Sequence, residues 1–576
     1  MKEKLEVLGV ENRHLSEISC ENINRIWLKH YDKDVRGNIN YPEIPLYKLL
    51  EDSASKNPEK TALIFFGKKI SYRELNELSD RVAGFLKDLG VKKGDRVVVD
   101  LPNTPHYVAA YYGILKLGAI VVQCNPMYST REIGYIIENS GAEHGFFAEF
   151  IYPRVSKFIE DGKLKKAIIC KMEDFLPFPL NFLYSIKKEK VKIDKSDRIA
   201  YWKDVINHPP TKERASINPR EDVAIFLYTG GTTGVPKAVM STHFNLVANA
   251  LQIIEWLPEK SPEEVFIGVL PYFHSYGMTT SMNAPIAYSA TIVLHPDPRD
   301  VKRILNSIQK YKVTIFCGVP TMYTAILNFP DLKKYSLKSI KFCISGAAPL
   351  PVEVKKRWEE TTGGKLVEGY GLSEASPVTH ANPLYGINKA GSIGIPLPDT
   401  YAVVVDDDGT ILPVGEEGEL AIYGPQVMKG YWNMEEETRK VLINGWLLTG
   451  DIAKMDEEGY FYIVDRKKDM IIAGGYNVYP REVEEVLYEH PAVLEAAVIG
   501  VPDPYRGEAV KAFVQLKPEY KGKVTEEELM KFCKEKLAPY KVPRSIEFRD
   551  ELPKTLVGKV LRRALREEEL KKMGKK

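Results

Sequence analysis

Short apolar runs alternate with amphipathic helical segments between residues 46 and 345, and this alternation constrains the fold more than any other feature. Runs such as TALIFF, DRVVVDL and AIFLYT are rich in apolar residues, whereas residues 71–90 repeat apolar positions at helical spacing. Apolar strands that alternate with helices form βαβ units, which build mostly parallel sheets covered by helices. We therefore expect an α/β protein with doubly wound, mixed sheets.

The pattern changes twice towards the C-terminus. Residues 385–465 contain short strands separated by Gly and Asp turns, which favours a small antiparallel β-barrel. After residue 465 helices and strands alternate again in an α+β pattern, and 576 residues are too many for one core. We predict a large N-terminal domain over 1–464 and a smaller α+β domain over 465–576.

Composition excludes several classes of protein. The formal net charge is +2, which gives no support for a nucleic-acid partner. The N-terminus lacks the apolar core of a signal peptide, and no run of about 18 apolar residues predicts a transmembrane helix. The six cysteines form no CxxC pair, so they are interpreted as small buried apolar residues in a reducing compartment. A cytoplasmic protein is expected.

One insertion is unusual. Residues 172–192 read MEDFLPFPLNFLYSIKKEKVK, in which aromatic and aliphatic residues precede a run of Lys and Glu. A loop packed on its own domain explains this pattern, and so does an exposed surface for a peripheral membrane contact or a homodimer. Both interpretations are consistent with the sequence.

The string YTGGTTGVPK, residues 228–237, directly follows an apolar strand. Glycines let the backbone approach an anion, while turn N–H groups and Thr hydroxyls donate to phosphate oxygens. Lys237 adds a positive charge for the outer phosphates. The string is not a Walker A loop, because Val235 and Pro236 separate the last glycine from the lysine.

This string resembles the phosphate loop of the adenylate-forming superfamily, which includes acyl-CoA synthetases, luciferases and peptide-synthetase adenylation domains. Further strings match that superfamily in the same order: PYFHSYG at 271–277, SGAAP at 345–349, EGYGLSE at 368–374, TGD at 449–451, DRKKD at 465–469 and PKTLVGK at 553–559. The resemblance extends over about residues 45–565, and it implies ATP, Mg²⁺ and CoA as cofactor and co-substrates.

By this resemblance, Thr229 and Glu374 hold Mg²⁺, for which oxygen ligands are suitable. Tyr370 stacks on adenine opposite residues 345–347, and Asp451 accepts both ribose hydroxyls. Ser373 stands where Thr is more frequent in the family. The residues expected to bind ATP or AMP are Thr229, Gly230, Gly231, Thr232, Thr233, Gly234, Lys237, Ser345, Gly346, Ala347, Glu368, Gly369, Tyr370, Gly371, Ser373, Asp451, Arg466 and Lys468.

The C-terminal domain is mobile in this superfamily, and the resemblance assigns it two roles. Lys559 is expected to bridge the carboxylate and the α-phosphate during adenylation. After a rotation about Asp465 or Lys468, the loop of Gly474, Gly475 and Tyr476 is expected to face the CoA thiol during thioester formation.

The acyl pocket is expected at Tyr276, Val319, Pro320 and Gly371, with His274 as a third catalytic residue beside Lys559 and Glu374. Acetate-specific relatives carry Trp at the position of Gly371, so glycine is interpreted as leaving room for a longer chain. Each methylene buried there would contribute about 0.8 kcal/mol. The resemblance thus implies a medium- or long-chain fatty acid.

The sequence therefore predicts an AMP-forming ligase that activates a fatty acid as acyl-AMP and transfers the acyl group to CoA. The alternatives are an aryl-acid or short branched-acid CoA ligase of the same superfamily, and a non-catalytic nucleotide-binding homologue. The latter would be expected to lack Lys559 or Glu374, and both residues are present.

Overall fold

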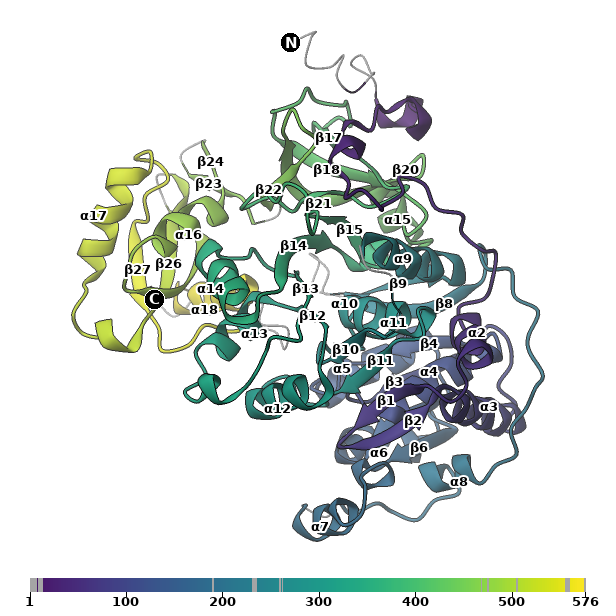
Figure 1. The fold of residues 1–576 in the computed structure, drawn as a ribbon. Coiled ribbons are helices and arrows are strands. Elements are labelled where there is room, and N and C mark those ends of the chain that lie inside the picture. Colours follow the sequence, from purple (N-terminus) through teal and green to yellow (C-terminus); the bar gives the residue numbers. More distant parts are fainter. Residues whose placement is uncertain are drawn as a thin grey trace. The chain divides into compact units, whose positions relative to one another are not determined.

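The computed structural model describes residues 8, 14–188, 191–229, 236–257, 261, 263–467, 469–473, 476–503, 506–554 and 560–573. The chain divides into two compact units (Figure 1). The larger unit contains residues 27–401 and 422–447. The smaller unit contains residues 1–26, 402–421 and 448–576.

A nine-stranded sheet forms one half of the larger unit. Its strand order is β16–β15–β14–β13–β12–β10–β11–β1–β2, and the neighbours from β14 to β1 are parallel. The strands are β1 (Thr61–Phe65), β2 (Lys68–Ser71), β10 (Val265–Gly268), β11 (Thr291–Leu294), β12 (Ile315–Gly318), β13 (Phe342–Ser345), β14 (Lys365–Gly371), β15 (Val378–Ala381) and β16 (Ile395–Pro396). Antiparallel strands complete both edges.

An eight-stranded sheet forms the other half, in the order β19–β9–β8–β4–β3–β5–β6–β7. The strands from β8 to β7 are parallel, whereas β9 and β19 are antiparallel to their neighbours. The strands are β3 (Arg96–Asp100), β4 (Ile120–Gln123), β5 (His144–Ala148), β6 (Lys166–Cys170), β7 (Ile199–Tyr201), β8 (Val223–Thr229), β9 (Lys237–Thr242) and β19 (Gly430–Tyr431).

Helices connect and cover these strands. Ser71 and Glu74 form a reciprocal capping box at the start of α3, and Ser129 and Glu132 do the same for α5. The helices of the larger unit are α2 (Lys48–Lys56), α3 (Tyr72–Asp88), α4 (Pro105–Lys116), α5 (Thr130–Ser140), α6 (Tyr152–Glu160), α7 (Leu180–Lys187), α8 (Trp202–Ile206), α9 (His243–Trp256), α10 (Ser275–Met278), α11 (Ala284–Ala287), α12 (Val301–Tyr311), α13 (Pro320–Leu327), α14 (Val352–Thr362) and α15 (Glu435–Val441).

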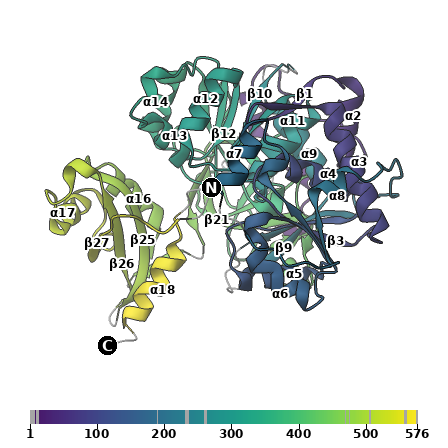
Figure 2. The ribbon, with the colours of Figure 1, turned by 90° about the horizontal axis from the view of Figure 1, so that it is seen from below.

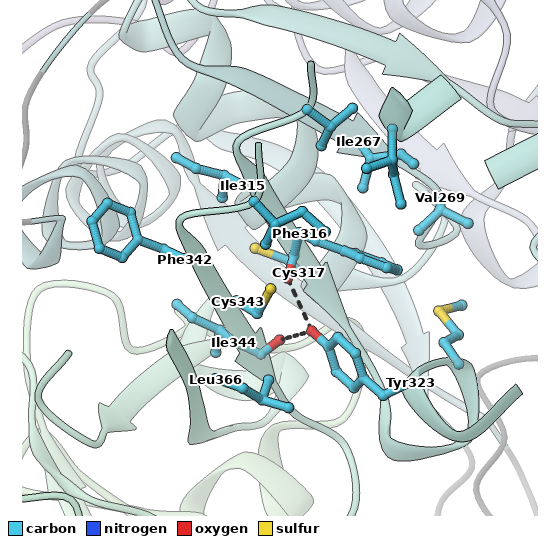
Figure 3. Close-up of a cluster of buried hydrophobic side chains, with 14 of the residues drawn as sticks. Ile267, Val269, Ile315, Phe316, Cys317, Tyr323, Phe342, Cys343, Ile344 and Leu366 are labelled. Atoms are coloured by element: carbon cyan, nitrogen blue, oxygen red, sulfur yellow. Dashed lines mark hydrogen bonds between the residues drawn. The ribbon is translucent and has the colours of Figure 1, made fainter. Parts of the chain in front are cut away.

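The core beside the nine-stranded sheet is built from side chains of β10, β12 and β13 and the helices that pack on them (Figure 3). Tyr323 is fully buried there, and its hydroxyl donates to the carbonyl oxygens of Phe316 at 2.9 Å and Ile344 at 3.1 Å. These bonds satisfy a polar group that would otherwise be costly to bury. They fix helix α13 against the carboxyl ends of β12 and β13.

A five-stranded sheet follows in the order β17–β18–β21–β20, with β22 paired to β21. Its strands are β17 (Tyr401–Val405), β18 (Gly418–Tyr423), β20 (Leu442–Ile443), β21 (Trp446–Met455) and β22 (Phe461–Arg466). The pairs β20–β21 and β21–β22 are antiparallel, in agreement with the expected antiparallel segment. Closure of this sheet into a barrel stays a prediction.

The C-terminal part contains a second five-stranded sheet in the order β24–β23–β26–β25, with β27 paired to β26. Its elements are β23 (Ile471–Ala473), β24 (Tyr476–Val478), α16 (Pro480–Tyr488), β25 (Val493–Asp503), β26 (Gly507–Leu516), α17 (Glu526–Lys536), β27 (Ser545–Phe548) and α18 (Arg562–Met573). A buried apolar cluster joins this sheet to α16 and α17. Figure 2 shows the ribbon of these two helices beside the sheet. The α+β pattern expected after residue 465 is therefore present, while the boundary at 464/465 stays a prediction.

Five of the six cysteines are buried and none is in a disulfide, as expected for small apolar residues. Within the described ranges, no helix combines the length and the apolarity needed to cross a bilayer.

Candidate adenylate-forming site

The predicted site residues fall on both units, and the structure describes the two groups separately. Those of the larger unit lie around β8, β9, β14 and α10, and those of the smaller unit lie on β21, β22 and β24. The predicted residues that lie outside the described ranges are Gly230, Gly231, Thr232, Thr233, Gly234, Lys468, Gly474, Gly475 and Lys559.

Strands β8 and β9 bring together the two ends of the predicted phosphate string. Thr229 is the last residue of β8 and pairs directly with Lys237, the first residue of β9. The apolar run before Thr229 is buried, which fixes this end of the hairpin in the sheet. Thr229 and Lys237 therefore lie side by side at the mouth of the predicted loop.

The ammonium group of Lys237 is almost buried and has two partners. Its Nζ lies 2.5 Å from Oε2 of Glu437 and 4.9 Å from the ring centroid of Tyr431. Hydrogen bonding by Lys237 and Lys440 lowers the pKa of Glu437 to about 2, so Glu437 is ionised near neutral pH. An anion that approached Lys237 would therefore compete with the Glu437 carboxylate, which already pairs with this ammonium group.

Glu374 lies close to the same strands, on a short 3₁₀ helix over Ser373–Ala375 that contacts β9. The Tyr431 hydroxyl donates to Oε1 of Glu374 at 2.9 Å, and the backbone N–H of Met428 donates to its carbonyl oxygen at 2.8 Å. Tyr431 thus connects the predicted metal ligand Glu374 to Lys237. Its own pKa is raised by burial and by the nearby carboxylates.

Strand β14 carries the residues predicted to contact the purine. Glu368 is buried, and its Oε2 accepts a hydrogen bond from the N–H of Leu350 at 3.3 Å. Tyr370 is half-buried and pairs with His380 across β14 and β15, with the ring centroids 6.0 Å apart. The register of β14 and β13 places Glu368 directly beside Ser345.

The segment after β13 shows two features typical of a ligand contact. Ser345 Oγ is fully buried and has no hydrogen-bond partner within the described part of the chain. Ala347 has a φ of 67°, in the left-handed region that non-glycine residues rarely adopt. An unsatisfied hydroxyl and a strained backbone beside one another favour a site shaped for a bound group.

The predicted acyl-side residues lie on the same edge of the nine-stranded sheet. The Tyr276 hydroxyl donates to the carbonyl oxygens of Ile344 at 2.8 Å and Gly318 at 3.2 Å. A Cβ atom on Gly346 would lie 3.1 Å from the Tyr276 ring, so glycine permits this close approach. Val319 and Pro320 begin α13 immediately after β12 and are buried.

His274 precedes α10, and burial lowers its pKa to about 4. It is therefore neutral near pH 7. Its neighbour Ser275 places Oγ 3.3 Å from the hydroxyl of Ser373, which connects this segment to the one that carries Glu374.

The sequence predicted that Gly371 leaves room for a longer acyl chain, whereas in the structure backbone lies beside it. A Cβ atom at this position would lie 2.2 Å from the carbonyl oxygen of Pro377, which is backbone and not open space. In this structure the glycine is required by the close approach of two chain segments. Its role in determining acyl-chain length stays a prediction.

In the smaller unit, Asp451 and Arg466 pair directly across β21 and β22. The Arg466 Nε lies 3.3 Å from Oδ1 of Asp451, and Asp451 is buried at 6% exposure. Gly450 has a φ of 72°, and its N–H donates to Glu419 Oε1 at 2.9 Å. These contacts fix the carboxylate that is predicted to accept the ribose hydroxyls.

Asp465, the predicted pivot, is buried in β22. Its carboxylate accepts hydrogen bonds from the backbone N–H of Arg481 at 2.7 Å and from Nη1 of Arg562 at 3.3 Å. Arg562 also contacts Glu484 at 2.6 Å and Asp469 at 3.3 Å. The structure thus ties Asp465 to α16 and α18.

Tyr476 belongs to the predicted loop of the CoA step. Its side chain is 59% exposed, and its ring stacks on Tyr540 with the centroids 4.6 Å apart.

Two side chains at this site were not predicted from the sequence, namely Tyr431 and Glu437. They lie in the segment GYWNMEEET, whose aromatic pair and run of three glutamates resemble an ordinary surface helix start. Tyr431 is identified by strand pairing, because β19 places it opposite Val239 of β9, and Glu437 is identified by its ion pair with Lys237.

Comparison with known proteins identifies the family. The AMP-binding enzyme family matches residues 50–432, and the AMP-binding enzyme C-terminal domain matches residues 482–559. The chain belongs to the AMP-binding enzyme family. The predicted membership of the adenylate-forming superfamily is therefore confirmed.

Two relatives of this AMP-binding enzyme match almost its full length. A long-chain-fatty-acid–CoA ligase of Bacillus subtilis (strain 168) is 49% identical over 94% of this chain and 98% of its own length. A long-chain-fatty-acid–CoA ligase of Escherichia coli O6:H1 is 39% identical over 96% and 100%, respectively.

The fold of this AMP-binding enzyme matches solved structures. An anthranilate CoA ligase in complex with anthranoyl-AMP has a TM-score of 0.82 at 28% identity, covering 97% of this chain and 100% of its own. The ATP-bound MatB from Rhodopseudomonas palustris has a TM-score of 0.79 at 30% identity, covering 91% and 98%. The predicted mixed α/β fold, with a large N-terminal and a smaller C-terminal domain, is confirmed.

Proposed function

We propose that this protein is an AMP-forming ligase that joins a long-chain fatty acid to CoA. The observation that carries the proposal is the near-full-length similarity to a long-chain-fatty-acid–CoA ligase at 49% identity. The cluster of Lys237, Tyr431 and Glu374 at the mouth of the β8–β9 hairpin supports it, because it supplies a cation and an oxygen ligand beside the predicted phosphate loop.

The reaction has two steps. In the first, a carboxylate oxygen attacks the α-phosphorus of ATP, which forms acyl-AMP and releases pyrophosphate. In the second, the CoA thiol attacks the acyl carbon and loses its proton, a thioester bond forms and AMP leaves. Both steps bring charged groups together, so binding, orientation and charge stabilisation account for most of the catalysis.

The residues of this chain would act as follows. Thr229 and the string that follows it hold the phosphates, with Lys237 beside them. Asp451 accepts the ribose hydroxyls, and Tyr370 stacks on the purine. His274, neutral because burial lowers its pKa to about 4, can accept or donate a hydrogen bond without adding charge near the acyl group.

The oxygen donors fit a magnesium ion that is bound mainly through the nucleotide. Within the described ranges, no group of three or more His, Cys, Asp or Glu side chains could hold a metal by itself. Mg²⁺ commonly binds one or two carboxylates together with substrate phosphates and waters. We propose that Glu374 and Thr229 hold it, and that when bound it neutralises charge on the phosphates.

The test is product analysis with a panel of acids from acetate to palmitate, including benzoate, with and without CoA. We expect AMP and pyrophosphate as products and the highest kcat/KM with long aliphatic acids. ADP and phosphate as products would reject adenylation. A preference for benzoate would favour the aryl-acid alternative, for which the anthranilate ligase similarity is the specific observation.

The division of roles between the two steps is tested by Lys559→Ala. We expect this variant to lose acyl-AMP formation by at least a hundredfold, because one stabilising charge contributes about 3 kcal/mol or more. Thiolysis of supplied acyl-AMP by CoA should change by less than about threefold. Equal loss in the two half-reactions would refute this division. The rotation about Asp465 or Lys468, the cytoplasmic location and a homodimer stay predictions.

A further inference from the structure

Helix α7 exposes apolar side chains that a surface helix normally buries. Phe178, just before the helix, is 84% exposed, and Phe182 and Ile186 are each 61% exposed. Leu180, Leu183 and Tyr184 are each more than 40% exposed. A cluster of this kind on one short segment differs from single exposed apolar residues, which need no explanation.

The segment is anchored at both ends. Phe175 and Leu176 are buried, and the Phe175 ring packs edge-on against His106 with the centroids 4.6 Å apart. At the other end Lys188 forms ion pairs with Glu149 and Glu173. In Figure 1 the helix between these anchors lies at the lower end of the larger unit. Its exposure therefore belongs to a fixed element.

Helix α7 turns its apolar side chains to solvent and its polar face towards the protein. Asn181 and Ser185 are four residues apart, share one face and are half-buried. The other face carries Leu180, Leu183 and Tyr184 next to Phe182 and Ile186, and all five are exposed. With 3.6 residues per turn, these five positions extend over about 200° of the helix circumference. A helix that only packs on its own domain shows the opposite arrangement.

The segment directly after α7 has a net positive charge, and one of its lysines, Lys188, is paired with Glu149 and Glu173. Residues 175–186 contain no acidic residue, and residues 187–195 contain five lysines and two acids, a net charge of +3. Apolar and aromatic side chains followed by lysines match the headgroup and acyl boundary of a bilayer with anionic lipids.

We propose that α7 docks this protein on an anionic lipid surface. The helix has eight residues, about 12 Å in length, so it lies in the interface and does not cross the bilayer. A second copy of the chain would cover one stripe of about 100°, whereas a lipid surface also surrounds the flanks of the exposed arc. The inference does not require the proposed reaction, although a fatty acid substrate would partition into the same lipid.

The experiment is flotation of the full chain with vesicles of phosphatidylcholine, and of phosphatidylcholine with about one third phosphatidylglycerol. The test variant is Phe182→Ser/Leu183→Ser/Ile186→Ser. The matched control is Val352→Ser/Tyr385→Ser/Ile387→Ser, whose side chains are exposed to 62%, 56% and 52% elsewhere on the larger unit. Thermal unfolding shows whether each variant is folded, and turnover of a short soluble acid reports the active site separately.

We expect the wild type and the control to float with the anionic vesicles, and the test variant to lose binding by at least about tenfold. Added salt should weaken binding, because lysines contribute. Equal flotation of the test variant and wild type, or no flotation of the wild type, would overturn the proposal. A wild-type dimer that the test variant dissociates, without vesicle binding, would assign α7 to a second copy instead. Equal binding to both vesicle types would overturn the anionic specificity.

Discussion

At the scale of single residues, the candidate site depends on Lys237 and the carboxylate that already neutralises it. Glu437 lies 2.5 Å from Lys237 and comes from α15, 200 residues further along the chain. A phosphate that binds Lys237 must share this cation with Glu437. The two neighbouring glutamates, Glu435 and Glu436, provide matched controls on the same helix.

Glu437→Gln should therefore strengthen nucleotide binding. Loss of the competing carboxylate leaves Lys237 to the phosphates alone, and we expect the KM for ATP to decrease by about twofold to fivefold. We expect kcat to change by less than about twofold, and Glu435→Gln to behave as wild type. An increase in the KM for ATP would show that Glu437 positions Lys237 and does not compete with the nucleotide.

Tyr431→Phe addresses the other side of this cluster. The substitution removes the hydroxyl that donates to Glu374 at 2.9 Å and keeps the ring that faces Lys237. Because the carboxylate loses a positioning partner, we expect the Mg²⁺ concentration for half-maximal activity to rise by about threefold to tenfold. The KM for the fatty acid serves as the internal control. An unchanged Mg²⁺ dependence would contradict the connection between Tyr431 and metal binding.

At the scale of elements, a buried charge cluster ties the connection before β8 to helices α3 and α4. Lys116 is fully buried on α4, and its Nζ donates to Asp80 at 2.8 Å and to Ser79 at 2.6 Å. Asp80 also contacts Lys212 at 2.6 Å and Arg214 at 2.5 Å. Burial alone would raise the pKa of Asp80, but these three cations hold it below its usual value.

Removal of the shared anion should be more harmful than removal of one cation. Asp80→Asn leaves the buried Lys116 without a carboxylate partner, whereas Arg214 keeps Glu51, and we expect a loss of about 3–5 kcal/mol in the free energy of unfolding. Lys116→Met leaves Asp80 with Lys212 and Arg214, so the loss should be smaller. Urea unfolding of both variants measures this order, and the reverse order would contradict the central role of Asp80.

At the scale of the whole molecule, buried histidines make stability depend on pH. Burial lowers the pKa of His243, His274 and His295 to about 4 and that of His380 to about 3. The native state keeps these rings neutral, whereas the unfolded state protonates them below about 6.5. Their contribution is therefore complete above pH 6.5 and is lost as the pH falls towards 4.

Each such histidine contributes a slope of about 1.4 kcal/mol per pH unit in this window. Asp100, whose pKa burial raises to about 7, acts in the opposite direction. We expect the urea midpoint to fall between pH 6.5 and 4.5. His295→Phe should lower the slope of the free energy of unfolding against pH by the contribution of one proton, about 1.4 kcal/mol per pH unit. The reason is that both ring nitrogens of His295 are buried without a partner in the described part of the chain. An unchanged slope would show that His295 does not contribute.

The sequence by itself determined the strand and helix pattern, because apolar periodicity and helix caps are local properties. The runs that lead to Thr229 and Ser345 became strands as expected, and Ser71 caps α3. The ordered motif strings also indicated the family, since residue types at fixed spacing carry the chemistry.

Only the tertiary structure decided which side chains meet. Tyr431 reaches Glu374, 57 residues earlier in the chain, because β19 pairs with β9 and β9 contacts the 3₁₀ helix of Glu374, and no local pattern reports such a contact. The backbone of Pro377 fills the space beside Gly371, and α7 turns its apolar face outward. These outcomes depend on the register and packing of distant segments, whereas periodicity specifies only that an element has two different faces.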